Sequence, residues 1–418
     1  MHTESAGQNA MLPLLPERLF RSYLNKRLRL FDVGSLRLRL PNGKEIQHTG
    51  TKTGPAAVIE IDRWRLLSKL LLEGEIGLAR SYVDGDWSTP DLAAVLDFGL
   101  HNEASISAAT RGLAVGHFVN RIVHSRNANT RKGSRRNIAA HYDLGNRFYQ
   151  LWLDSELTYS SAIFSGDQET LEVAQTRKLD RVVELLDLEG GDSVLEIGCG
   201  WGSLARRIVG AGAGQVTGIS LSREQVDYAR AHQADLTTAE TLKFELRDYR
   251  SLTERYDRVA SIEMFEAVGE QYWPMYFDVL RRSLKPDGKA VLQIITIADE
   301  LFESYRSRPD FIQQYIFPGG MLPTVAIVQR EAARAGLRVE QYEPFGISYA
   351  RTLEIWQQRF NAAWPEIERL GFDDRFRRMW NYYLTYCAVG FRHGSIDVGL
   401  FKLSPIEEAT GHRHAEAP

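Results

Sequence analysis

The sequence predicts an α/β protein whose larger part is a doubly wound, Rossmann-like, mostly parallel sheet, preceded by a smaller α+β domain. Three observations support this prediction. From residue 138 onward, short apolar runs alternate with segments of helical periodicity. The apolar runs are hydrophobic throughout, as expected for strands that are covered on both faces. A glycine-rich turn, GCGWG at 198–202, follows the first of these runs.

The smaller α+β domain is predicted over residues 1–103. Its first half alternates apolar and polar positions in the manner of strands, with the turn PNGKE at 41–45 between two runs. Its second half changes to helical spacing. Residues 104–137 follow as a polar segment, and no acidic residue lies between Glu103 and Asp143. We expect this segment to be an exposed basic linker.

The larger domain is predicted over residues 138–418. A helix between consecutive strands places those strands in parallel, so the alternation itself predicts the sheet type. The turn KPDG at 285–288 is expected to precede the fifth strand. The predicted strands cover 192–198, 215–220, 242–249, 257–264 and 289–297, and the predicted helices cover 203–212, 222–234 and 271–284.

Composition restricts the compartment and the partners. The 418 residues carry a formal net charge of -3, so no overall field favours nucleic acid. Cys199 and Cys387 are the only cysteines, which fits a reducing compartment. The N-terminus lacks the pattern of a signal peptide, and no apolar run is long enough to span a membrane. We therefore expect a cytoplasmic protein that meets a bilayer only from outside its hydrocarbon core.

The glycine-rich turn is expected to bind S-adenosylmethionine. Its pattern G-x-G-x-G lacks the spacing of the dinucleotide fingerprint, and no lysine follows it as in a P-loop. The acid before it, Glu196, suits a ligand that carries an ammonium and a sulfonium, and it would repel a phosphate. A tight strand–helix turn without a ligand is the alternative. The candidate contacts in the turn are Gly198, Gly200 and Gly202.

Polar residues at the ends of the next two strands are candidates for the rest of this ligand. Ser220 stands where a dinucleotide-binding domain would carry a ribose-binding acid, so Ser220 and Gln225 are candidates for ribose and methionine contacts. At the end of the third strand, Asp248 offers an acceptor and Tyr249 a ring for an adenine. Asp248 is equally well explained as a helix cap.

Around this core the chain resembles the cyclopropane-fatty-acyl-phospholipid synthases and their mycolic-acid relatives, which are Rossmann-like class I methyltransferases. The segment GEIGLARSYVDGDW at 74–87 is similar to that family's amino-terminal lipid-engaging domain. The other shared motifs run in order through the larger domain and are AAHYDLGNRFYQLWLDSELTYSSAIF (139–164), VLEIGCGWGSLA (194–205), GISLSREQ (218–225), SIEMFEAVG (261–269), YIFPGGMLP (315–323), RFNAAWPEI (359–367) and YYLTYCAVGFR (382–392).

The resemblance implies roles for individual residues. Tyr159 and Ser160 would contact the methionine portion of the donor, and the segment from Ser220 through Leu221 to Gln225 would follow its ribose. The family holds a bicarbonate base with a cysteine, a glutamate, a histidine, a backbone group and a tyrosine. The corresponding residues here are Ser161, Glu266, Gln293, Ile295 and Tyr349. Because the cysteine and the histidine are replaced, bicarbonate binding and ring closure are both open questions.

The expected reaction is transfer of a one-carbon unit to the cis double bond of an unsaturated phospholipid acyl chain. An isolated alkene is a poor nucleophile, and the carbocation it forms is trapped by water, so the site must be dry and aligned. The product is a cyclopropane or a methyl or methylene branch. The alternatives are a small-molecule C- or N-methyltransferase and a catalytically degenerate lipid-binding protein. The resemblance also implies a homodimer on the inner face of the cytoplasmic membrane; no metal is expected.

Overall fold

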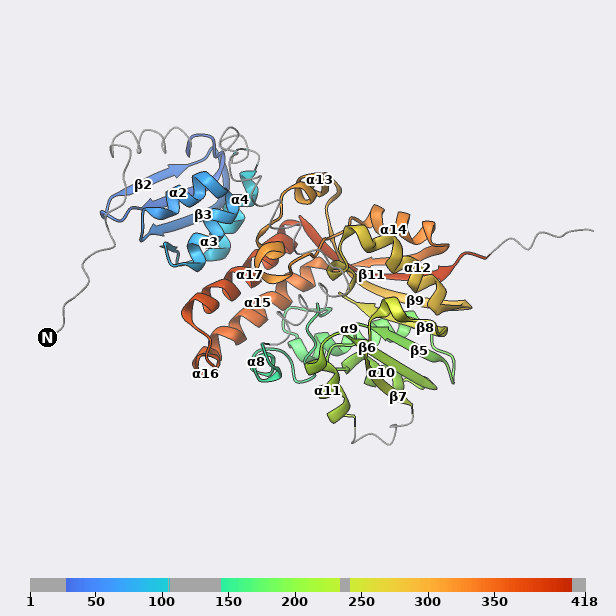
Figure 1. The fold of residues 1–418 in the computed structure, drawn as a ribbon. Helices are drawn as coiled ribbons and strands as arrows, with labels where there is room; N and C mark the ends of the chain where they lie inside the picture. Colours follow the sequence, from blue (N-terminus) through green and yellow to red (C-terminus); the bar gives the residue numbers. More distant parts are fainter. Residues whose placement is uncertain (1–27, 104, 106–143, 234–240, 408–418) are drawn as a thin grey trace, which may run out of the picture.

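The structure, a computed structural model, describes residues 28–103, 105, 144–233 and 241–407. A small α+β unit lies beside a larger α/β unit whose central sheet is mostly parallel (Figure 1). The predicted fold class is therefore confirmed. The predicted basic linker lies outside the described residues except for Ser105.

The small unit is a four-stranded sheet in the order β2-β1-β3-β4. Strand β1 pairs antiparallel with β2 and parallel with β3, and β3 pairs antiparallel with β4. Leu36 and Leu38 of β1 are buried against Phe98 and Trp87, as the alternation of the sequence predicts. The strands are β1 (Val33–Arg39), β2 (Glu45–Thr49), β3 (Lys52–Ile61) and β4 (Trp87–Ser88), and the helices are α2 (Arg65–Glu73), α3 (Glu75–Val83) and α4 (Leu92–His101).

The larger unit has a seven-stranded sheet in the order β10-β11-β9-β8-β5-β6-β7. Strands β5 to β9 are parallel, and β11 runs antiparallel to both of its neighbours. The strand order reverses at β5, so the crevice at the carboxyl ends of β5, β6 and β8 is where such folds bind ligands. The strands are β5 (Ser193–Ile197), β6 (Gln215–Ser220), β7 (Leu242–Leu246), β8 (Tyr256–Ile262), β9 (Leu284–Ile297), β10 (Leu337–Pro344) and β11 (Ile396–Pro405).

Helices cover both faces of this sheet (Figure 1). Along β5, Val194 belongs to the core on one face, whereas Leu195 and Ile197 belong to the core on the other. This division explains why consecutive positions of a parallel strand such as β5 are apolar. The helices are α8 (Asn146–Gln150), α9 (Leu171–Leu186), α10 (Ser203–Gly210), α11 (Arg223–Ala231), α12 (Trp273–Ser283), α13 (Asp299–Ser307), α14 (Val325–Arg334), α15 (Gly346–Ala362), α16 (Trp364–Arg369) and α17 (Asp374–His393).

The edge of the sheet differs from the sequence prediction. The segment KPDG at 285–288 was expected as a turn, but it lies inside β9. The pairing of β8 with β9 shifts its register between Tyr256 and Arg258, and this irregularity accommodates the extra residues. Strands β10 and β11 were not predicted at all.

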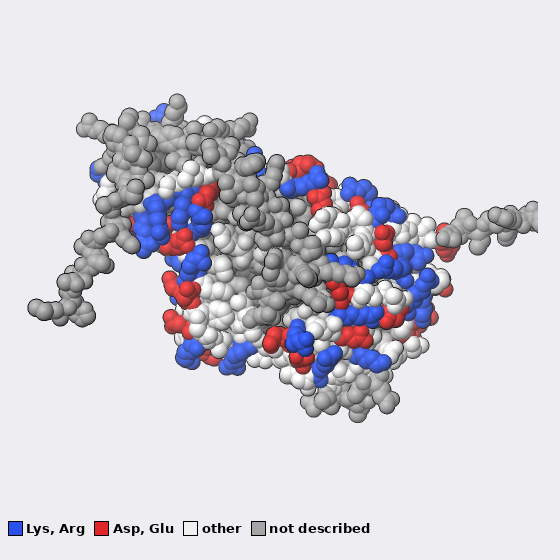
Figure 2. Space-filling view, in the orientation of Figure 1, with Lys and Arg blue, Asp and Glu red and all other residues white. Residues whose placement is uncertain are grey.

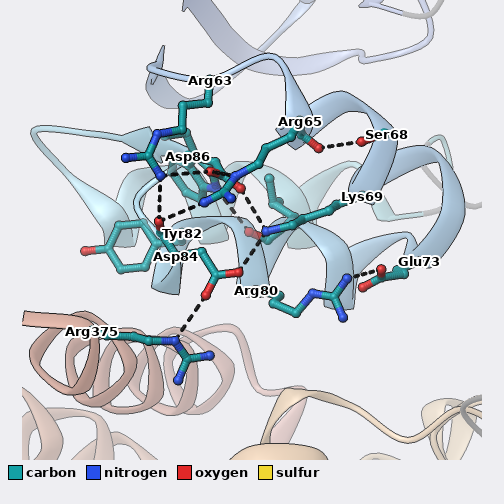
Figure 3. Close-up of polar contacts among 12 residues, drawn as sticks. Arg63, Arg65, Ser68, Lys69, Glu73, Arg80, Tyr82, Asp84, Asp86 and Arg375 are labelled. Atoms are coloured by element: carbon teal, nitrogen blue, oxygen red, sulfur yellow. Dashed lines mark hydrogen bonds and ion pairs between the residues drawn. The ribbon is translucent and has the colours of Figure 1, made fainter. Parts of the chain in front are cut away.

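Helix α17 joins the two units. Its Arg378 donates hydrogen bonds to the carbonyl oxygens of Tyr82 (2.5 Å) and Trp87 (2.6 Å) in the small unit, and its guanidinium lies over the Tyr82 ring. Arg375 pairs with Asp84 at 3.1 Å. Figure 3 shows that Asp84 also receives Lys69 Nζ, at 2.8 Å, within a larger group of charged residues. Polar contacts therefore hold the small unit against α17.

We expect Arg378→Ala to weaken this contact by about 1–3 kcal/mol, because the variant loses two hydrogen bonds donated by a charged group. The measurement is hydrogen–deuterium exchange, which should become faster in the amides of residues 82–88 and stay unchanged in β5 and β6. Arg369→Ala, an exposed arginine at the end of α16, is the matched control and should exchange like the wild type. Unchanged exchange at 82–88 in Arg378→Ala would contradict the role of Arg378.

Candidate functional site

The glycine-rich turn connects β5 to α10 and requires glycine on steric grounds. Gly202 has φ +87° and caps α10, and a Cβ atom there would lie 2.6 Å from the Phe244 ring. Gly198 has φ +85°, and a Cβ atom there would meet the Met264 side chain at 3.0 Å. At Gly200 a Cβ atom would meet no described atom within 4 Å. The turn therefore packs tightly at both ends and is open in its middle.

A cavity lies over this turn at the carboxyl ends of β5, β6 and β8. Its wall includes nine of the eleven residues that the sequence assigns to the donor. These nine are Tyr159, Ser160, Glu196, Gly198, Gly200, Ser220, Leu221, Gln225 and Tyr249. Gly202 and Asp248 are not part of the wall.

Glu196 is a buried carboxylate without a full set of partners. Its side chain is 3% exposed, and its Oε2 atom has no hydrogen-bond partner among the described residues. Burial raises the pKa of Glu196 to about 8, against the opposing charges of Lys178 and Arg206. An unpartnered carboxylate oxygen in a cavity wall suits a cationic group of a ligand.

Helix α9 holds the loop that carries Tyr159 and Ser160. Lys178 is fully buried and donates to Ser160 Oγ at 2.5 Å. One turn earlier, Gln175 donates to the carbonyl oxygens of Thr158 (3.3 Å) and Ser160 (2.8 Å). Burial lowers the pKa of Lys178 to about 8, and the carboxylates of Glu263, Asp154 and Glu196 oppose that shift. Lys178 is thus a buried cation in the wall of the cavity.

The ends of β6 and β7 contribute unequally. Ser220 Oγ donates to Gln225 Oε1 at 3.0 Å, so these two predicted residues act as one polar unit. Asp248 caps the short helix η1 (Tyr249–Ser251) and forms an ion pair with Arg250 at 2.7 Å, which is the capping role that the sequence left open. Tyr249 and Arg250 line the cavity, whereas Asp248 lies outside the cavity wall and pairs with Arg250.

A second group of polar residues surrounds Glu263, which follows β8 and lines the same cavity. Its Oε1 atom accepts hydrogen bonds from the Ser161 backbone N–H (2.8 Å) and from Gln293 Nε2 (2.6 Å). Its Oε2 atom accepts one from the Tyr349 hydroxyl at 2.6 Å. Glu263 has φ +49°, a left-handed conformation that costs a residue other than glycine roughly 1–2 kcal/mol. Three donors hold the side chain in this unfavourable backbone position.

The five predicted catalytic residues lie together around two carboxylates. Three of them, Ser161, Gln293 and Tyr349, contact Glu263, and the backbone N–H of Ile295 donates to Glu266 Oε1. Ser161 contributes its backbone, because its hydroxyl donates to the Ala162 carbonyl oxygen at 2.9 Å.

Glu266 differs from Glu263 in its surroundings. Its Oε2 atom is buried and has no partner among the described residues. Burial, and then the charge of Glu263, raise the pKa of Glu266 to about 8. Burial also raises the pKa of Glu263, but its hydrogen bonds and Lys178 oppose that shift. Glu266 is therefore biased toward the neutral form, whereas three hydrogen bonds and Lys178 stabilise the carboxylate form of Glu263.

Sequence reasoning missed Glu263. The signal was present, since an acid directly after a parallel strand at the point where the strand order reverses lies at the ligand-binding edge. The motif SIEMFEAVG offers two acids three residues apart, and only the second was singled out.

Aromatic side chains enclose this polar group. The Tyr349 ring stacks on Phe391 with centroids 4.5 Å apart, and Tyr159 and Tyr383 share a hydrogen bond of 2.9 Å between their hydroxyl groups. Trp356 lies against the Tyr159 ring with centroids 5.3 Å apart. Most of these rings come from α15 and α17. The site therefore has an apolar, aromatic wall beside its two carboxyl groups.

The cavity fits the donor that the sequence indicates. The unpartnered Glu196 oxygen suits the ammonium of a methionine group. The open middle of the glycine turn leaves room for the ligand to lie against the backbone at Gly200. Tyr249 offers a ring face for the adenine. S-Adenosylmethionine would supply an activated methyl group there.

We expect Glu196→Gln to lower the affinity for S-adenosylhomocysteine tenfold to a hundredfold, about 1.5–3 kcal/mol, because a charge-assisted hydrogen bond is lost. Since the pKa of Glu196 is raised to about 8, ligand binding must release its proton below that pH. Wild-type affinity should therefore rise from pH 6 to pH 8. Isothermal titration calorimetry in buffers of different ionisation enthalpy measures both the affinity and the proton release.

The matched control is Glu189→Gln, an exposed glutamate shortly before β5, which should keep the wild-type affinity and proton release. Equal affinity in Glu196→Gln and the wild type, or an affinity independent of pH, would show that Glu196 does not contact the ligand.

Comparison with known proteins agrees with this site. Residues 129–401 match the family model described as mycolic acid cyclopropane synthetase. A tuberculostearic acid methyltransferase of Mycobacterium tuberculosis is 38% identical over 344 residues, which are 78% of this chain and 78% of that protein. The cyclopropane-fatty-acyl-phospholipid synthase of Escherichia coli is 36% identical over 352 residues, which are 82% of this chain and 86% of that protein.

A solved structure shares the fold of the larger unit. The crystal structure of a mycolic acid cyclopropane synthase complexed with SAH and CTAB aligns with a TM-score of 0.61 at 33% identity, covering 64% of this chain and 97% of that one. The match of the family model, the relatives aligned over 78% and 82% of this chain, and the donor cavity lead to one conclusion. This chain is an S-adenosylmethionine-dependent methyltransferase and belongs to the mycolic acid cyclopropane synthetase family.

Proposed function

We propose that this enzyme transfers a one-carbon unit from S-adenosylmethionine to the cis double bond of an unsaturated acyl chain in a membrane phospholipid, through a carbocation. Family membership establishes the coarser activity, which is S-adenosylmethionine-dependent cyclopropane or methyl transfer to lipid acyl chains. One observation carries the finer proposal: the donor cavity and the buried carboxylate group share a wall at Glu263.

This shared wall meets the demands of alkene alkylation. An isolated double bond attacks a methyl donor only when the two are held in line, and the carbocation that forms is trapped by any nearby water. The Trp356 and Phe391 rings pack on Tyr349, which contacts Glu263, and such apolar rings beside the carboxyl group favour a dry site and present faces that stabilise a cation. The carboxylate of Glu263 adds a fixed negative charge on the cavity side.

The phospholipid substrate is supported by the length of the relatives. The mycolic acid synthase structure aligns with 64% of this chain, whereas the Escherichia coli phospholipid synthase aligns with 82%, which is more than the larger unit alone provides. The Escherichia coli relative extends into the small unit and is named for a phospholipid substrate; the tuberculostearic acid methyltransferase, at 78% of this chain, also extends into it. We therefore assign lipid engagement to the small unit.

The small unit supports contact with a bilayer surface. No helix in the described parts of the chain is long and apolar enough to cross a membrane. On α2, Leu66 is in the core at 3% exposure, whereas Leu72 near the other end of the helix is 58% exposed, so the helix presents an apolar residue to solvent. Over the face drawn in Figure 2, basic and acidic side chains are intermixed. We also propose that the enzyme contacts the inner face of the cytoplasmic membrane peripherally and that it forms a homodimer.

The test uses the full chain, S-adenosylmethionine with a labelled methyl group, and liposomes of a phospholipid with one cis double bond in each acyl chain. We expect label in the acyl chains, because the donor and alkene are brought together in one dry site. Mass spectrometry of the released acyl chains before and after catalytic hydrogenation identifies the product. A ring keeps its mass under mild hydrogenation, whereas a methylene branch gains two hydrogen atoms.

Liposomes of a fully saturated phospholipid are the control and should remain unlabelled. Absence of label in the unsaturated lipid would overturn the proposed function. Label on a free small amine or phenol instead would favour a small-molecule methyltransferase. Binding of liposomes and of S-adenosylhomocysteine without any methyl transfer would favour a lipid-binding protein without turnover.

A further inference from the structure

Glu263 occupies a position where the surrounding donors are arranged to hold an anion. Three donors converge on its carboxylate, and they come from separate parts of the chain: Ser161 before α9, Gln293 on β9 and Tyr349 on α15. Ser161, Gln293 and Tyr349 are three of the five residues that the resemblance assigns to a bound bicarbonate. Their donor groups already form hydrogen bonds with the two carboxylate oxygens of Glu263.

A free anion would have to displace this side chain. The backbone N–H of Ile295, a fourth predicted contact, is also taken, because it donates to Glu266 Oε1. The remaining Gln293 Oε1 atom has no partner among the described residues, and as an acceptor it offers no donor to an anion. The backbone N–H and hydroxyl of Ser161, the Gln293 side-chain amide, the Ile295 N–H and the Tyr349 hydroxyl each therefore donate to a carboxylate or to a backbone carbonyl oxygen of the chain.

We propose that Glu263 is the base of the reaction, a carboxylate built into the chain that takes the proton from the alkylated acyl chain without bicarbonate. The inference rests on the proposed function and deepens it. It moves the base from a bound anion to a residue that contacts the cavity directly.

The proton transfer balances without any further reactant. Once the methyl carbon has bonded to the alkene, the neighbouring carbon is cationic. A C–H bond then breaks, its proton goes to a carboxylate oxygen of Glu263, and its electron pair forms a C–C bond. If the broken C–H bond is on the transferred carbon, the electron pair closes a cyclopropane ring. If a hydride shift comes first, loss of a proton from the transferred carbon makes the new bond a C=C double bond and leaves a methylene branch. The carboxylic acid then returns its proton to solvent through the cavity that Glu263 lines.

The charges around Glu263 suit this role. Lys178 of α9 is a buried cation facing it, and Tyr349 of α15 donates to it. Glu266 is the like-charged neighbour, and the hydroxyl of Tyr383 on α17 also faces it. Burial raises the pKa of Glu263, which makes its carboxylate a stronger base than an exposed one, while the donors and Lys178 oppose that shift and stabilise the carboxylate form. Glu266, biased toward the neutral form, is a poorer acceptor.

The decisive variants are Glu263→Gln and Glu263→Gly. The amide of Glu263→Gln fills the same space without a basic oxygen, so turnover should fall at least a hundredfold and should not respond to added anions. Glycine accepts the positive φ of this position and leaves the three donors open. Glu263→Gly should therefore lose turnover to the same extent and regain at least tenfold of it with formate or bicarbonate.

A binding measurement separates the role of Glu263 from turnover. We expect carbon-13 NMR of labelled bicarbonate to show line broadening with Glu263→Gly and none with the wild type. Wild-type turnover should stay within twofold when carbon dioxide and bicarbonate are removed. Glu266→Gln should keep more of its turnover than Glu263→Gln, since an amide resembles the neutral acid. Circular dichroism and the affinity for S-adenosylhomocysteine check that each variant is folded.

Three results would overturn the inference: wild-type turnover that depends on added bicarbonate, Glu263→Gln with more than a tenth of wild-type turnover, or a greater loss in Glu266→Gln than in Glu263→Gln. If the variants fail to fold, the bicarbonate dependence of the wild type still decides. If the wild type labels no lipid at all, the proposed function fails instead, and bicarbonate binding still reports whether the donors around residue 263 hold an anion.

Discussion

The site depends on one physical constraint: a carboxylate taken out of water must be given hydrogen bonds or a counter-charge. Glu263 receives three hydrogen bonds, and each donor belongs to a segment far away in the sequence. Satisfying this single group therefore fixes the loop before α9, the end of β9 and the first turns of α15 against one another. Lys178 extends the same arrangement to Ser160 and hence to the donor cavity. Removing the carboxylate would leave several buried polar groups unsatisfied at once.

Much of the fold was predictable because its strands and helices alternate along the chain. Each βα unit of the parallel sheet is local in sequence, and strands buried on both faces are marked by continuous apolar runs. Strand β11 has no such mark: Ile396–Pro405 mixes polar with apolar residues and pairs antiparallel with β9, more than ninety residues earlier in the chain. The inclusion of KPDG in β9 also depends on pairing, since only the register shift opposite Tyr256 accommodates it. Long-range pairing of this kind leaves no local signal.

The donor cavity was more predictable than the reacting centre. The glycines follow from local sterics, Glu196 and Ser220 follow from their places near strand ends, and Gln225 follows from its place in the first turn of the next helix, α11. The reacting centre is assembled from four separate segments, which are the loop before α9, the residues after β8, β9 and α15. The identity of its residues therefore does not reveal which atom each one offers. Ser161 contributes a backbone N–H, which no side-chain comparison indicates. Glu263 was missed because it adopts a left-handed backbone, a conformation usually reserved for glycine, and because Glu266 lies three residues away.

Helix α17 has two occupied sides, and this limits how the chain can change. One side carries Trp380 and Tyr383 into the aromatic wall of the site, and the other carries Arg375 and Arg378 to the small unit. Because each residue of a helix advances its face by about 100°, inserting or deleting a single residue within α17 would turn one set of contacts away while the other stayed in place. Substitutions can accumulate along this helix, but its length cannot change. The spacing between its arginines and its aromatic residues determines how the two parts of the protein are positioned.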